Sequence, residues 1–283
     1  MLKPLVVLVF IHWTRQRRCE RYPSMRLNRF FVPFLMLISP AAIFAADQPV
    51  RVAVFDGPGV GASAKPLIAS LQEAKNQKFQ ITRITAEQIQ NGKLADVDVL
   101  VHPGGSGSKQ GNALGESGRK AVKDFVRQGG GFLGICAGAY LASNDYPWSL
   151  KLIDAKVVDK RHWARGNGEV ELSLSPSGKK FFGQSTNKMA IHYAQGPLLA
   201  RPEWDDPEVP DYESLAVFAS EIAENGAPRG IMVATSAAVR CTYGKGRVFC
   251  FSPHPELTEG LHHLIPLTVD WLATAKQSGD SKK

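Results

Sequence analysis

The residue of this chain best suited to act as a nucleophile is Cys136. It lies in residues 134–138, Gly-Ile-Cys-Ala-Gly, where a short apolar run ends and a segment of small residues begins. Glycine and alanine permit the tight bend from strand to helix that this pattern predicts. The bend would place the sulfur at a helix N-terminus, where unpaired N–H groups favour a thiolate over a thiol. We therefore predict a reactive cysteine, and keep a simply buried thiol as the alternative.

A histidine and a carboxylate that could assist this thiol follow much later in the chain. His254 lies between Pro253 and Pro255, which stiffen the backbone and prevent strand pairing at those positions. Glu256 could accept a hydrogen bond from one imidazole nitrogen and leave the other facing a nucleophile. These residue types predict a triad with Cys136, although a histidine near a glutamate is also common as an ordinary surface pair.

A glycine-rich turn supplies the third part of the predicted site. Pro103, Gly104 and Gly105 follow residues 97–102, a predicted buried strand. In parallel sheets the carboxyl ends of neighbouring strands meet at one edge, and glycines there leave backbone N–H groups open to an approaching oxygen. We expect this turn to lie beside Cys136. A plain surface turn is the alternative.

The elements that must position these residues alternate between strands and helices. Strand patterns cover residues 50–55, 80–85, 97–102 and 132–135, and helical patterns cover 64–75, 86–94 and 115–128. This alternation predicts an α/β fold with a doubly wound, mostly parallel sheet and helices on both of its faces.

The second half of the chain carries shorter strand patterns and a probable turn-linked pair of strands. Strands are expected over residues 150–158, 169–174, 189–193, 215–218 and 231–235, with a loop over 204–212 and a helix over 261–275. Residues 237–243 and 247–252 predict a C-terminal β-hairpin that turns at Gly244. Cys241 and Cys250 lie on its two arms, and whether they pair stays open.

Charge and hydropathy divide the chain into a leader and one domain. The 283 residues carry a formal net charge of +8, but residues 1–45 hold 7 of the 34 basic residues and 1 of the 26 acidic ones. The remainder is close to neutral and has no basic stripe with interleaved aromatic residues, so nucleic acid is not an expected partner. We interpret residues 1–45 as a signal peptide region, with Met25 as an alternative start and cleavage after Ala45. Residues 46–283 then form a single exported domain, periplasmic or secreted, with no permanent membrane span.

Together these motifs resemble the class I glutamine amidotransferase-like superfamily, whose fold is flavodoxin-like. They are most similar to the amidotransferase-like N-terminal domain of biotin-protein ligases, on the motifs at residues 103–105, 130–140, 193–197 and 243–247. The resemblance implies that Cys136 is the nucleophile, His254 the general base and Glu256 the group that orients it. It also implies that backbone N–H groups of Ala137 and the glycine turn, at Gly104 and Gly105, form an oxyanion hole.

The substrate pocket is the part that the resemblance leaves open. Glutamine-hydrolysing members usually carry Gln two residues after the second elbow glycine, where this chain has Tyr140. The resemblance therefore does not carry glutamine over as the substrate, and we expect Tyr140 and Tyr193 to line a pocket for a small or peptide-like molecule. No cofactor is implied. A metal site is disfavoured because the five histidines that could contribute to one, at positions 162, 192, 254, 262 and 263, lack helical i, i+4 spacing.

Two functions fit these observations. The first is an exported Cys-His-Glu hydrolase that cleaves an amide or ester through a thioester intermediate. The second is a catalytically idle module that keeps the fold and binds a small ligand in the same pocket. A nucleophilic Cys136 that depends on His254 would favour the first, and ligand binding that survives Cys136→Ser would favour the second.

Overall fold

The computed structural model describes residues 48–75, 78–204 and 206–280. These residues fall in one compact unit, Ala46–Lys283. The predicted signal peptide region and the alternative start at Met25 lie outside the described residues. Among the described helices, none has the length and apolar character needed to cross a bilayer.

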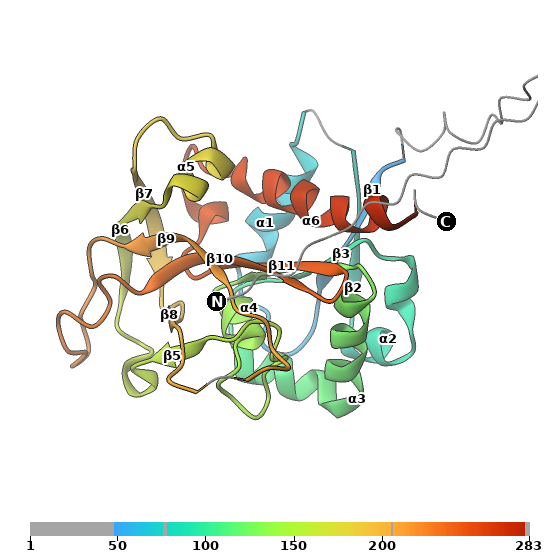
Figure 1. Ribbon diagram of the computed structural model, residues 1–283, viewed down its shortest axis with the longest axis horizontal. Helices are drawn as coiled ribbons and strands as arrows, with labels where there is room; N and C mark the ends of the chain where they lie inside the picture. The colour runs from blue at the N-terminus through green and yellow to red at the C-terminus, as the bar shows by residue number, and fades with distance from the viewer. Residues whose placement is uncertain (1–47, 76–77, 205, 281–283) are drawn as a thin grey trace, which may run out of the picture. The chain divides into compact units, whose positions relative to one another are not determined.

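A single sheet runs through the unit and joins a parallel half to an antiparallel half (Figure 1). The parallel half contains, in spatial order, β2 (Phe79–Ile84), β1 (Val50–Phe55), β3 (Val99–His102), β4 (Gly131–Ile135) and β11 (Gly246–Phe251). The antiparallel half continues through β10 (Ser236–Tyr243), β9 (Glu213–Phe218), β6 (Asn167–Leu174) and β7 (Lys188–Ala194). Two short strands, β5 (Lys156–Val158) and β8 (Leu198–Ala200), pair with each other, and β8 also pairs with β10. The fold is thus mixed α/β.

Helices cover both faces of the parallel half. On one face lie α1 (Ala64–Gln72) and α6 (Leu264–Asp280), and on the other α2 (Ala86–Gln90), α3 (Gly107–Arg127) and α4 (Ala137–Ala142) (Figure 1). The strands therefore bury side chains on both sides. In β1, Val52 and Val54 pack into the core beside α1 and α6, whereas Ala53 and Phe55 pack into the core beside α2 and α3. This double burial explains the continuous apolar runs of these strands.

The β10–β11 hairpin brings the last strand of the chain into the middle of the sheet. Gly244, with φ of 61°, forms its turn. β11 pairs with β10 on one side and in parallel with β4 on the other. Cys241 lies opposite Val248 rather than opposite Cys250, and both thiols are free and buried.

The sheet differs from the sequence prediction in its second half. It is mixed rather than mostly parallel, because β6, β7, β9 and β10 pair with their neighbours in antiparallel fashion. Residues 231–235 form turns, not a strand, and Ala234 has φ of 66° there. Of residues 150–158, only Lys156–Val158 forms a strand.

Two helices also differ from expectation. α3 begins at Gly107, eight residues before its apolar periodicity starts, because the Ser106 side chain caps it by accepting a hydrogen bond from the Lys109 N–H. At Gly115 (φ 61°) the helix is kinked. The unexpected α5 (Pro176–Phe182) is capped by Ser175, whose Oγ accepts from the Gly178 N–H.

Candidate active site

Cys136 lies on the bend between β4 and α4 in a strained backbone conformation, with φ of 49° and ψ of −98°. Its N–H donates to the Phe251 carbonyl on β11 at 2.8 Å, and its Sγ lies 3.4 Å from the Ala194 carbonyl oxygen. The neighbouring glycines are required by close packing. A Cβ on Gly138 would lie 2.1 Å from the His102 carbonyl oxygen. A strained backbone that is held in place by close packing is typical of functional positions.

His254 lies three residues after the end of β11, over the same sheet edge. Its Nδ1 is 2.7 Å from Oε1 of Glu256, and its own N–H donates to the His192 carbonyl at 2.8 Å. Burial disfavours the charged ring, but interactions with Cys136 and Glu256 outweigh it and raise the pKa of His254 to about 10. The site therefore favours an imidazolium beside the sulfur.

The glycine turn after β3 faces these two side chains. In the described part of the chain, the N–H groups of Gly104 and Gly105 have no hydrogen-bond acceptor. Ala137 is the first residue of α4, and an N–H at that position has no intrahelical partner. Gly105, with φ of 135°, comes so close to Gly59 that a Cβ would lie 2.1 Å from its carbonyl oxygen. The N–H groups of Gly104, Gly105 and Ala137 thus have no hydrogen-bond partner within the turn or the helix, and all three belong to segments beside Cys136.

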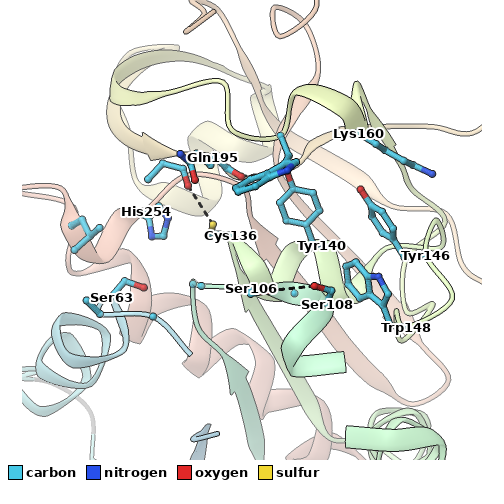
Figure 2. A pocket seen from close by; sticks show the side chains of 18 residues that line it. Ser63, Ser106, Ser108, Cys136, Tyr140, Tyr146, Trp148, Lys160, Gln195 and His254 are labelled. Atoms are coloured by element: carbon cyan, nitrogen blue, oxygen red, sulfur yellow. Dashed lines mark hydrogen bonds between the residues drawn. The ribbon is translucent and has the colours of Figure 1, made fainter. Parts of the chain in front are cut away.

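These groups open onto a cavity of about 620 Å³ (Figure 2). Its lining includes five of the residues chosen from the sequence, namely Cys136, His254, Gly104, Gly105 and Tyr140. Glu256 is buried behind His254, and Ala137 does not line the cavity. The lining residues that sequence reasoning missed include Ser63, Ser108, Tyr146, Trp148, Lys160 and Gln195.

Tyr193 is buried in the core instead of lining the cavity. Its hydroxyl donates to the Gly196 carbonyl at 2.8 Å and its ring packs edge-on against Phe218. On β7 it shares the buried face with Met189 and Ile191. This alternation is visible in the sequence and could have placed Tyr193 in the core.

Aromatic residues close the end of the cavity away from His254 (Figure 2). The rings of Tyr146 and Trp148 stack with their centroids 4.4 Å apart, and the Tyr140 hydroxyl donates to the Gln195 carbonyl at 3.2 Å. Lys160 lies 4.9 Å from the Tyr146 ring centroid and pairs with Asp145 at 2.7 Å. Because the Lys160 ammonium is already paired with the Asp145 carboxylate, the aromatic end of the cavity carries little net charge.

The segment that carries Lys160 and Trp163 is held by Arg165. This side chain is only 1% exposed, and its Nη2 donates to Oδ2 of Asp159 at 2.6 Å. The other Asp159 oxygen lies 2.6 Å from Nδ1 of His162. Asp159 itself has φ of 55°, so the ion pair holds a left-handed turn beside the cavity. Within the described residues, no group of three or more His, Cys, Asp or Glu side chains is placed to bind a metal ion.

Comparison with known proteins relates part of this chain to one family. Residues 50–170, somewhat less than half of the chain, match the family described as "Biotin-protein ligase, N terminal". The biotin–protein ligase of Schizosaccharomyces pombe is 36% identical over 67 residues. This match covers 24% of the chain and only 11% of the ligase.

Solved structures with a similar arrangement are more distant. A glutamine amidotransferase from Thermotoga maritima has 14% sequence identity and a TM-score of 0.47, with 82% of this chain and 96% of that chain covered. A beta-galactosidase from Bacillus circulans sp. alkalophilus has 12% identity and a TM-score of 0.48, with 81% of this chain but only 31% of that chain covered. The family match and the yeast ligase confirm the resemblance drawn from the motifs: residues 50–170 of this chain are similar to the N-terminal part of biotin-protein ligases.

Proposed function

We propose that this protein is an exported hydrolase that cleaves an amide or ester through a thioester on Cys136. One observation carries the proposal: Cys136 is strained and lies in one cavity with His254, whose pKa is raised to about 10 despite burial, through interactions with Cys136 and Glu256. Such coupling is expected of a nucleophile and its base. The proposed export rests on the apolar leader within residues 1–45.

In the proposed reaction, His254 holds the proton of the Cys136 thiol before the substrate binds. The sulfur attacks the substrate carbonyl carbon, a C–S bond forms, and the carbonyl π electrons move to the oxygen. Backbone N–H groups of Gly104, Gly105 and Ala137 stabilise the resulting oxyanion. As the carbonyl re-forms, the bond to the leaving nitrogen or oxygen breaks, and His254 gives that atom its proton.

The second step uses water and restores the proton on His254. His254 takes a proton from a water molecule, whose oxygen attacks the thioester carbonyl. The C–S bond breaks, the acid leaves, and His254 keeps the proton taken from the water. Glu256 keeps the imidazole oriented and stabilises its positive charge throughout.

The cavity indicates what kind of substrate to screen. Its reactive end holds Cys136 and His254, and its far end is aromatic with Lys160 already paired. These features favour a small or peptide-like molecule whose non-reacting part is uncharged. Ligase chemistry is not proposed, because the matched segment spans only 11% of the yeast ligase.

Cysteine alkylation tests the proposal directly. We expect iodoacetamide to label Cys136 at about pH 6 much faster than Cys241 or Cys250, with His254→Ala removing that advantage. The matched control is His263→Ala, which removes an exposed histidine and should leave the labelling rate unchanged. If Cys136 is inert, or reacts equally fast without His254, the proposed hydrolase function is wrong. Thermal-shift screening of Cys136→Ser would then test the binding module.

A further inference from the structure

Ser63 carries a buried hydroxyl that the fold itself does not use. The residue precedes α1 at the helix-capping position, but its side chain makes no capping hydrogen bond. It is 8% exposed, and its Oγ is buried with no hydrogen-bond partner among the described residues. At three other helix starts a hydroxyl side chain does cap the backbone, namely that of Thr85, Ser106 and Ser175. A buried hydroxyl without a partner destabilises the fold, and a ligand in the cavity would supply the missing partner.

The Ser63 hydroxyl faces the space in which the proposed reaction takes place. It lines the same cavity as Cys136 and His254, and in the close view it lies below the His254 ring (Figure 2). A Cβ built on Gly104 would lie 2.7 Å from Ser63 Oγ and 2.8 Å from Cε1 of His254. Gly104 therefore packs closely against both groups, so the serine hydroxyl and the histidine ring meet at the glycine turn.

We infer that Ser63 donates a hydrogen bond to the carbonyl oxygen of the substrate. This inference rests on the proposed hydrolase function and adds a side-chain donor to the backbone N–H groups of Gly104, Gly105 and Ala137. When the sulfur of Cys136 forms its bond to the carbonyl carbon, the π electron pair moves to that oxygen. A hydrogen bond to the charged oxygen is stronger than one to the neutral carbonyl, so the Ser63 hydroxyl lowers the barrier.

The test compares two reactions of the same sulfur. Acylation of Cys136 by p-nitrophenyl acetate passes through an oxyanion, whereas alkylation by iodoacetamide does not. Ser63→Ala should slow acylation by about tenfold or more and leave alkylation within about twofold of the wild-type rate. The matched control is Ser70→Ala, which removes a buried hydroxyl on α1 that already bonds to the Pro66 carbonyl. It should change neither rate.

The possible outcomes distinguish a wrong role for Ser63 from a wrong hydrolase function. If wild type is acylated in a His254-dependent way and Ser63→Ala is acylated equally fast, the inference fails and the hydrolase stands. If Ser63→Ala slows alkylation as much as acylation, the serine acts on the thiol or on the fold and the inference also fails. If wild type is not acylated on Cys136, or is acylated without any need for His254, the hydrolase fails and the inference falls with it.

Discussion

Nδ1 of His254 lies 2.7 Å from Oε1 of Glu256, and both side chains are almost completely buried. With Cys136, this carboxylate raises the pKa of the histidine from 6.5 to about 10. Below pH 6.5 both the folded and the unfolded chain carry the proton, and the stabilisation is complete. Above that pH the unfolded chain loses the proton while the folded chain keeps it, so the stabilisation declines and is gone once the pH passes about 10.

We therefore expect the stability difference between wild type and His254→Gln to shrink from pH 6.5 to about 10. Urea denaturation at several pH values, with the free energy of unfolding compared at each, measures it. His263→Gln serves as the control because that histidine is exposed. A difference that stays constant across this range would contradict the coupling of His254 to its partners.

Two glycines of the site should respond differently to the same added methyl group. In Gly104→Ala the new Cβ meets only side-chain atoms, of Ser63 and His254, so we expect a folded protein with Cys136 acylation slowed at least about tenfold. In Gly138→Ala the Cβ meets the backbone oxygen of His102 at 2.1 Å, which should destabilise the fold by about 3 kcal/mol. Thermal unfolding and the acylation rate of each variant check this. Equal losses of stability would argue against it.

The thiols of the hairpin should be inert in the folded protein. Burial raises the pKa of Cys241 to about 12, and the pKa of Cys250 is also raised by burial. We expect mass spectrometry after native alkylation to find both unmodified and unpaired, and both labelled once the protein is denatured without reductant. A disulfide between them would show that the hairpin register differs from the one described here.

The ion pair of Arg165 with Asp159 should contribute strongly to stability. Arg165→Ala leaves the side chain of Asp159, which is 12% exposed, without its guanidinium partner and should cost about 3 kcal/mol or more. The exposed pair of Lys188 and Glu171 provides the control, since Lys188→Ala should change stability by no more than about 0.5 kcal/mol. Denaturant midpoints measure both. Similar effects of the two variants would mean that the buried pair has no special role.

The local parts of this architecture could be predicted from the sequence. The run Val50–Phe55 is a strand over the predicted residues, and the small residues around Cys136 form the expected bend into α4. Both depend on neighbours in sequence, namely an apolar run bounded by turn residues and glycines where backbones approach closely. His254 and Glu256 could be placed for the same reason, because the two prolines hold them at a strand end.

The rest of the cavity lining could not be predicted, because it comes from segments distant in sequence. Ser63 comes from the loop before α1, Gln195 from the end of β7 and Trp148 from the connection after α4. Their proximity depends on tertiary packing, which composition and periodicity do not describe. Beyond the predicted hairpin, the antiparallel pairing could not be predicted either, because the sequences of β6 and β9 carry no signal for the direction in which these strands pair.

β11 is the last strand in sequence but lies between β4 and β10. The strand therefore joins both halves of the sheet, and it brings His254 to Cys136 at the same time as its Phe251 carbonyl accepts the Cys136 N–H. During synthesis, Cys136 emerges from the ribosome long before His254. Under the proposed mechanism the cysteine therefore gains its base only late in folding, once β11 has joined the sheet.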